Sequence, residues 1–140
     1  PSTVYGPVED KTNRLMNIFI NSALKNEDLK IFGDPNTKTL DFTYVEDFID
    51  GIMLTLNGGW NKEYDISGGE EFKVFDLAEF IIKETESSSK IIILDGEIAQ
   101  PQKVNLDLSE IKRLGYSPKV NLLDGVRKNI DYLKNLDSLK

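Results

Sequence analysis

The 140-residue sequence contains no cysteine and no histidine. Disulfides, thiol catalysis, the usual Ser–His or Cys–His nucleophilic pairs and the common zinc ligand sets are therefore excluded. The sequence also lacks a glycine-rich phosphate loop, a secretory signal and any apolar run long enough to span a membrane. From these absences we expect a cytoplasmic protein that has no membrane partner and binds no metal.

Positive charge is scarce, because 17 Lys and Arg residues stand against 24 Asp and Glu residues, for a net charge of −7. A general nucleic-acid surface needs a basic face, so we expect no nucleic-acid partner. A small anionic ligand remains compatible with this charge, since one locally basic pocket is enough. The length and the 39% hydrophobic content predict a single soluble globular domain.

Apolar residues recur at alternating strand and helix spacing, which predicts an α/β fold. The expected strands, the last of them buried, are 2–5, 29–32, 40–45, 63–66 and 91–94. Five helices are expected, at 12–24, 48–56, 74–82, 107–114 and from 121 onward. The sequence predicts Thr12 as the N-cap of the first helix, and Asp107 with Glu110 as a capping box. The inner face expected for the first helix is Leu15, Ile18, Phe19 and Ser22.

Acidic residues gather around the third expected strand and the helix after it, at Asp41, Glu46, Asp47 and Asp50. Hard oxygen ligands of this kind can hold magnesium. Acidic side chains are also common at a helix N-terminus, where the free N–H groups and the macrodipole favour negative charge. We favour this structural interpretation for the cluster.

Two further features invite a chemical interpretation. Gly68-Gly69 lacks the third glycine of a dinucleotide fingerprint, so a plain strand-to-helix turn is favoured over a phosphate turn. Tyr5 and Tyr44 each end a strand, but no lysine stands four residues beyond either of them to lower its pKa. We therefore interpret both tyrosines as packing or ligand contacts.

Five segments in register resemble a known family. They are "VYGP" (4–7), "IFGD" (31–34), "LDFTYVEDFIDGI" (40–52), "YDISGGEEFKVFDLAEFI" (64–81) and "LGYSPKVNLLDGV" (114–126). In order and spacing they resemble the C-terminal, substrate-binding part of extended short-chain dehydrogenases/reductases. Among these the match is to the NAD-dependent nucleotide-sugar epimerase/dehydratase family, which includes UDP-glucose 4-epimerase.

The resemblance implies that residues 1–140 form a single substrate-binding lobe. The NAD-binding Rossmann domain, the catalytic Ser/Thr and the Tyr-x-x-x-Lys pair would precede Pro1 in the full-length protein, which would be a homodimer. The implied function is selection of a nucleoside-diphosphate sugar for oxidation at C4, followed by re-reduction or dehydration, with NAD as cofactor. The lobe would dock onto its own Rossmann domain, so we expect exposed apolar surface at residues 2–5 and 48–56.

The resemblance also implies site residues. Pro1 would lie near the nicotinamide of NAD. The implied substrate-binding residues are Thr3, Asn13, Arg14, Leu15, Lys30, Phe32, Gln100 and Lys103. The family carries diphosphate-binding arginines at the positions occupied here by Leu40 and Gln100, and the substitutes open to this chain are Arg14, Lys38 and Lys103. Each residue also has a plainer interpretation: Phe32 as core, and the polar ones as exposed surface.

Two other functions are compatible with the sequence. The chain can be a non-enzymatic module that keeps a sugar-nucleotide pocket as a sensor, or only a surface for a partner. It can also belong to an NAD(P)-dependent reductase of a small carbonyl substrate, an alternative favoured by the missing arginines. Sugar-nucleotide affinity without cofactor would favour the sensor, and competition by free UDP in the full-length enzyme would count against the reductase.

We expect this chain, when supplied with NAD and UDP-glucose, to form no UDP-galactose. The physical reason is that the sequence holds no histidine or cysteine base, and the resemblance places the catalytic tyrosine and lysine before Pro1. Chromatographic separation of the two UDP-sugars measures this directly. Turnover above the protein-free background would contradict the interpretation.

Overall fold

The structure, a computed structural model, describes residues 1–8, 10, 12–58, 61–96 and 106–138. In these residues it contains five strands and five helices, which confirms the predicted α/β class. The strands are β1 (Thr3–Tyr5), β2 (Leu29–Phe32), β3 (Thr39–Tyr44), β4 (Glu71–Lys73) and β5 (Ile91–Leu94). The helices are α1 (Leu15–Leu24), α2 (Val45–Thr55), α3 (Val74–Glu84), α4 (Ser109–Arg113) and α5 (Leu122–Ser138). None of the described helices is long and apolar enough to cross a bilayer.

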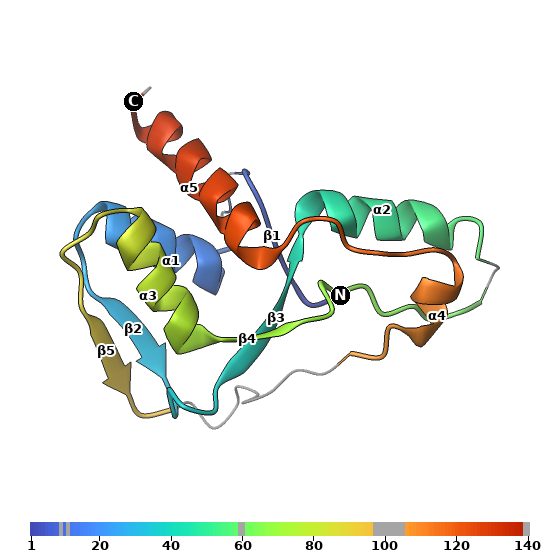
Figure 1. The fold of residues 1–140 in the computed structure, drawn as a ribbon, viewed down its shortest axis with the longest axis horizontal. Coiled ribbons are helices and arrows are strands. Elements are labelled where there is room, and N and C mark those ends of the chain that lie inside the picture. The colour runs from blue at the N-terminus through green and yellow to red at the C-terminus, as the bar shows by residue number, and fades with distance from the viewer. Residues whose placement is uncertain (9, 11, 59–60, 97–105, 139–140) are drawn as a thin grey trace.

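The strands form two small sheets (Figure 1). In the first, β3 lies between β1 and β4. Its second half pairs parallel with β1, from Thr3 opposite Phe42 onward, and its first half pairs antiparallel with β4, where Thr39 faces Lys73. In the second sheet β2 and β5 pair in parallel, beginning with Leu29 opposite Ile91.

The main core lies where α1, α3 and α5 pack on the strands. Its most buried large side chains include Phe19 and Ile20 of α1, Leu77 of α3 and Val126 of α5. Figure 1 shows α1 and α3 beside the β2–β5 sheet, while α2 and α4 occupy the other end of the molecule. A smaller cluster lies at that end, formed by Ile66, Leu108, Ile111 and Tyr116.

The first helix begins later than the sequence predicts, so Thr12 as its N-cap is wrong. The Asp10 carboxylate accepts the Thr12 N–H at 2.8 Å and the Arg14 N–H at 3.2 Å, which folds this segment into a turn. Asn13 then takes a φ of 53°, a left-handed conformation that interrupts a right-handed helix. Arg14 consequently occupies the N-cap position, and α1 starts at Leu15.

The buried face of α1 also differs from the prediction. Ile18 is 46% exposed and Ser22 only half-buried, whereas Met16, Ile20 and Ala23 are buried along with Phe19. Both stripes have helical spacing, and hydrophobicity alone does not distinguish them. The choice depends on how the helix packs on α3 and α5. For α5 the helical spacing predicts an inner face of Leu122, Val126, Ile130 and Leu133; the last three are buried, and Leu122 is half-buried against the core.

Two strand predictions are wrong. Residues 63–66 form no strand, although Ile66 O accepts a hydrogen bond from Ser2 N at 3.2 Å. The strand β4 was not predicted, because only Phe72 is apolar in it. The strand β5 exists but is not buried, since Ile92 and Ile93 are 36% and 43% exposed. It is an edge of a two-stranded sheet, which covers little of either face.

The predicted capping box at α4 is wrong as well. Asp107 does accept the Ser109 N–H at 2.9 Å, but the N-cap is Leu108 and no side chain caps the helix. Glu110 pairs instead with Arg113 one turn along the same helix. The short helix is thus held by its own turn and by burial of its apolar side, and not by a reciprocal cap.

Two acidic residues of α2, Asp47 and Asp50, have structural partners, which supports the structural interpretation for them. Asp47 is 2% exposed, and its two oxygens accept the backbone N–H groups of Lys119 at 2.9 Å and Val120 at 3.1 Å. Asp50, one turn on, forms an exposed ion pair with the Lys119 ammonium at 2.6 Å. Asp47 therefore fixes the segment between α4 and α5 against the start of α2.

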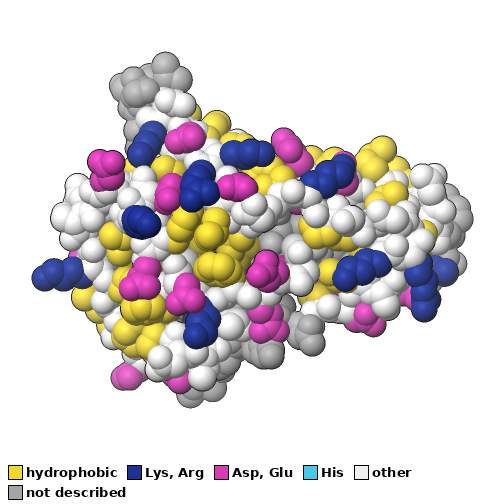
Figure 2. Space-filling view, viewed as in Figure 1, with side chains coloured by type: hydrophobic (Ala, Val, Ile, Leu, Met, Phe, Trp, Pro, Cys, Tyr) yellow, Lys and Arg dark blue, Asp and Glu magenta, His cyan; other side chains and the backbone are white. Residues whose placement is uncertain are grey.

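The outer face of α2 is apolar and exposed, as the sequence predicts. Ile49, Ile52, Met53 and Leu56 are 51%, 40%, 57% and 71% exposed, respectively. Figure 2 shows hydrophobic side chains gathered on the surface over this helix. A run of exposed large apolar side chains on one helix face is typical of an interaction surface.

Replacing Asp47 by alanine should destabilise the fold by about 2–4 kcal/mol, because two partly buried N–H groups lose their acceptor. Chemical denaturation measures this change in unfolding free energy. The control is Asp50→Asn, which removes only an exposed ion pair to the same Lys119 and should cost less than about 1 kcal/mol. Equal losses in the two variants would contradict the assigned role of Asp47.

Candidate functional site

The first of two adjoining clefts, called here the β2 cleft, lies between β2 and the start of α1. It has a volume of about 460 Å³ and is lined by Asn13, Leu15, Ile18, Phe19, Lys30, Ile31, Phe32, Lys38, Leu40 and Val74. Strand alternation buries Leu29 and Ile31, with Lys30 exposed and Phe32 half-buried, so Lys30 and Phe32 share a face of β2. The cleft therefore combines an apolar wall with two ammonium groups.

The second cleft, called the β1 cleft, lies along β1. Its volume is about 500 Å³ and its lining residues are Pro1, Ser2, Thr3, Val4, Arg14, Leu15 and Asp41. Leu15, the first residue of α1, lines both clefts and so lies at the boundary between them. Together the two clefts form a site large enough for a ligand with an apolar and a polar part.

Every implied site residue that the structure describes lines one of these clefts. Asn13, Lys30 and Phe32 line the β2 cleft, Pro1, Thr3 and Arg14 line the β1 cleft, and Leu15 lines both. Leu40, where the family carries an arginine, also lines the β2 cleft. Gln100 and Lys103 lie outside the described residues. The structure thus brings seven residues from three separate segments together, while their role in binding stays a prediction.

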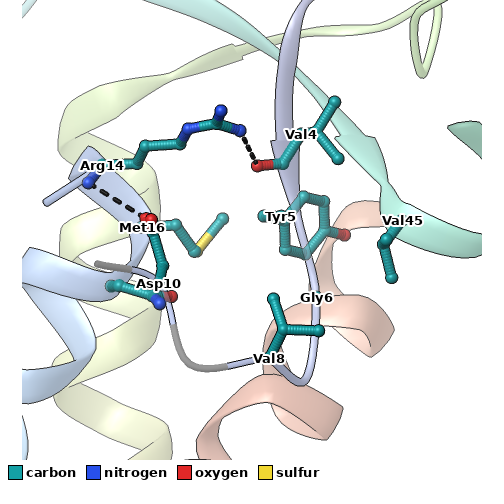
Figure 3. A pocket seen from close by; sticks show the side chains of 9 residues that line it. Val4, Tyr5, Gly6, Val8, Asp10, Arg14, Met16 and Val45 are labelled. Carbon is teal, nitrogen blue, oxygen red and sulfur yellow. Dashed lines mark hydrogen bonds between the residues drawn. The ribbon is translucent and has the colours of Figure 1, made fainter. Parts of the chain in front are cut away.

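Arg14 connects the β1 cleft to a third, smaller cavity of about 210 Å³, shown in Figure 3. Its Nη1 donates to the carbonyl oxygen of Val4 at 3.0 Å, and its backbone N–H donates to Asp10 at 3.2 Å. Both bonds appear as dashed lines in Figure 3. The guanidinium is therefore held beside β1, and its positive charge lies next to both the β1 cleft and the smaller cavity.

Tyr5 and Tyr44 are buried and pack against each other. Burial raises the pKa of Tyr5 far above its ordinary value, with smaller contributions from Tyr44, Asp47 and Asp124. Its hydroxyl donates to Leu122 O at 3.2 Å, and its ring meets that of Tyr44 edge-on at 5.6 Å. A tyrosine with a raised pKa is a poor base near neutral pH, so the packing interpretation is supported for Tyr5.

Gly68 belongs to a packing turn and not to a phosphate loop. A Cβ at Gly68 would lie 2.2 Å from the carbonyl oxygen of Phe42, so only glycine fits so close to β3. Asp41 holds this turn, since it accepts the Ser67 hydroxyl at 2.7 Å and the Gly68 N–H at 3.2 Å.

Sequence reasoning missed several cleft residues as site candidates, among them Asp41, Ile18 and Lys38. The sequence presents Asp41 as part of an acidic cluster, Ile18 as a core residue and Lys38 as a substitute for an arginine. The signal for Ile18 was the second apolar stripe on α1. Nothing in the sequence placed the side chain of Lys38 or Asp41 in a cleft, because that position depends on the path of the chain between β2 and β3.

Comparisons with known proteins confirm the resemblance. Residues 1–67 match the NAD dependent epimerase/dehydratase family. Among curated relatives, a UDP-glucuronic acid decarboxylase of Arabidopsis thaliana is 32% identical over 126 residues, which are 87% of this chain and 36% of that protein.

Solved structures resemble the fold closely. The UDP-glucose 4-epimerase of Thermotoga maritima with UDP-glucose superimposes with a TM-score of 0.88 at 27% identity, covering 99% of this chain and 45% of that one. The UDP-glucuronic acid 4-epimerase of Bacillus cereus with UDP-glucuronic acid and NAD gives 0.83 at 32% identity, covering 96% and 44%. The chain spans less than half the length of each of these three proteins.

Two isoleucines of α1 differ in exposure, so replacing each by alanine should lower the unfolding free energy by different amounts. Ile20→Ala removes a side chain that is 0% exposed and should destabilise the fold by about 2–5 kcal/mol. Ile18→Ala trims a side chain that is 46% exposed at the β2 cleft and should change stability by less than about 1 kcal/mol. Urea titrations of both variants measure the difference. A larger loss in Ile18→Ala would mean that the helix packs through the face predicted from sequence.

Proposed function

We propose that this chain is the substrate-binding part of an NAD-dependent nucleotide-sugar epimerase/dehydratase. Its task is to bind a nucleoside-diphosphate sugar in the β2 and β1 clefts and to orient the sugar for oxidation at C4 in the full-length protein. The supporting relatives have names or bound ligands that are UDP-sugars, including UDP-glucose and UDP-glucuronic acid. Other residues decide which sugar is bound and whether that sugar is epimerised or loses a group.

One observation carries the proposal. The residues implied to bind the ligand come from β1, the start of α1 and β2, and the fold gathers them around two clefts that share Leu15. The aromatic ring of Phe32 and the apolar side of Leu15 suit a nucleobase, while the cations Arg14 and Lys30 suit phosphate oxygens. Thr3, farther along the β1 cleft, then faces the sugar.

NAD supplies the acceptor and donor of hydride when it is bound. The described residues offer this cofactor only the edge of the β1 cleft, where Pro1 lies, because they include no glycine-rich phosphate turn. We therefore assign most of the cofactor site to a separate nucleotide-binding domain. Within this chain, Thr3 and Arg14 hold the sugar and the adjoining phosphates beside Pro1.

The surface of the chain supports docking of such a domain. The exposed apolar residues of α2 lie on the helix that directly follows β3. Within the part of the chain that the structure describes, β1 pairs with β3 and has no strand on its other side. If the docked domain adds a parallel strand beside β1, the helices that accompany that strand would lie near the apolar face of α2. The homodimer and the cytoplasmic location expected from the sequence belong to the same proposal and remain predictions.

The decisive experiment is calorimetric titration of the natural protein that contains this chain with UDP-glucose and UDP-glucuronic acid. The Leu15→Glu variant puts a negative charge at the boundary of both clefts and should weaken binding at least about tenfold. The matched control is Leu24→Glu, a similarly half-buried leucine at the other end of α1, where binding should stay within about twofold.

The outcomes separate clearly. Loss of affinity in Leu15→Glu alone, with both variants folded by circular dichroism, supports the proposed site. Equal affinity in the two variants places the ligand elsewhere. If the unmodified protein binds neither UDP-sugar nor free UDP, the proposed function is wrong, and the reductase or interaction-module alternative takes its place.

A further inference from the structure

Two asparagines are buried where α1 packs on α5. Asn17 of α1 is 6% exposed and Asn129 of α5 is 0% exposed, and the amide Nδ2 of Asn129 donates to Asn17 Oδ1 at 3.0 Å. The other amide atom of Asn129, Oδ1, is buried and has no hydrogen-bond partner among the described residues. A buried acceptor without a partner lowers the stability of a fold. Stability alone therefore does not account for this pair.

A buried polar pair between helices fixes one arrangement where apolar packing permits several. In coiled coils, a single asparagine at a core position specifies the register of the helices at a cost in stability. The helix α1 needs such a choice, because it carries two apolar stripes at helical spacing. Ile18 and Ile20 are the same residue type, yet Ile20 is 0% exposed and Ile18 is 46% exposed. Hydrophobicity leaves the rotation of α1 about its axis open, and the hydrogen bond at Asn17 fixes it.

The rotation of α1 decides which residues face the clefts. Leu15 lines both clefts and Arg14 lines the β1 cleft. Arg14 and Asn17 are three residues apart and so share one side of the helix, and both line the smaller cavity. The N-cap residue Arg14 gives the first turn no side-chain cap. In the other rotation, the stripe that contains Leu15 and Ile18 turns to the core, and Leu15 leaves the boundary between the clefts.

We propose that Asn129 is a positioning residue of the nucleotide-sugar site, because through Asn17 it fixes the rotation of α1 that brings Arg14 and Leu15 to the clefts. This inference rests on the proposed function and extends it to two residues that line neither the β1 nor the β2 cleft. Asn129 acts through α1 and not by touching the ligand. Its unpartnered oxygen is the stability cost of selecting one rotation, as is typical of residues that serve a site.

The test is the double variant Asn17→Leu/Asn129→Leu, called the double-leucine variant, in the natural protein that contains this chain. It replaces both partners by apolar side chains of similar shape, so no unpartnered amide is left between the helices. The urea midpoint should therefore stay equal or rise. Affinity for UDP-glucose and UDP-glucuronic acid, measured by calorimetry, should fall at least about tenfold.

The matched control is Asn135→Leu, which makes the same replacement at an exposed position of α5. Its affinity for both UDP-sugars should stay within about twofold of the unmodified protein, since exposed substitutions away from a site have small effects. A loss of affinity confined to the double-leucine variant supports the inference, and an equal loss in both variants contradicts it.

Thiol labelling reports the rotation without any ligand. The chain contains no cysteine, so Ile18→Cys and Ile20→Cys each introduce one thiol into it. Maleimide labelling is followed by mass spectrometry on the peptide that carries the thiol, in the unmodified and the double-leucine backgrounds. In the unmodified background position 18 should label faster. The ratio of the rates at positions 18 and 20 should fall at least about tenfold in the double-leucine background, because α1 loses its preferred rotation.

Three results would overturn the inference. An unchanged labelling ratio means that the pair does not set the rotation, whatever the affinity. A lower ratio with unchanged affinity means that the rotation does not control the site. A double-leucine variant that is less stable or does not fold means that the pair only supports the core. If the unmodified protein binds neither UDP-sugar, the proposed function fails by itself, while a lower ratio still supports the role of Asn129 in orienting α1.

Discussion

The pairing of β3 on both of its sides is the interaction on which the rest of the structure depends. Its second half holds β1 in parallel and its first half holds β4 antiparallel, while Tyr44 leads directly into α2. The run from Asp41 to Tyr44 is buried throughout. Thr3 in the β1 cleft is therefore positioned by Phe42, and Leu40 in the β2 cleft by its pairing with Phe72, so one strand aligns the walls of both clefts.

Buried polar side chains hold the segments that no strand or helix organises. Asp41 binds the turn at Gly68, Asp47 binds the segment before α5, and Lys38 binds the end of β2. A buried carboxylate or ammonium is costly unless its hydrogen bonds are satisfied, so each of these bonds selects one path for the chain. Long connecting segments thereby acquire fixed positions in a small protein with only short strands.

The candidate site combines this rigidity with both charged and apolar side chains. The cations Arg14 beside β1 and Lys38 beside β2 are each held by a bond to a backbone carbonyl oxygen, of Val4 and of Phe32 respectively. The chain spans less than half the length of these relatives, and the proposed function assigns the chemistry to groups outside it. In the proposed function, its contribution is selection and orientation of the ligand.

The sequence by itself determined the α/β class, the five helices, most strands and the exposed apolar face of α2, because periodicity is a local property. Through the order of its motifs it also pointed to seven of the residues that line the clefts. The tertiary structure alone decided which stripe of α1 is buried, since Ile18 and Ile20 have equal hydrophobicity and only packing on α3 and α5 separates them. It also decided that Asp10 and not Thr12 orders the start of α1, and that Lys38 lines a cleft. Those outcomes depend on contacts between residues distant in sequence or on turn geometry, which no local pattern encodes.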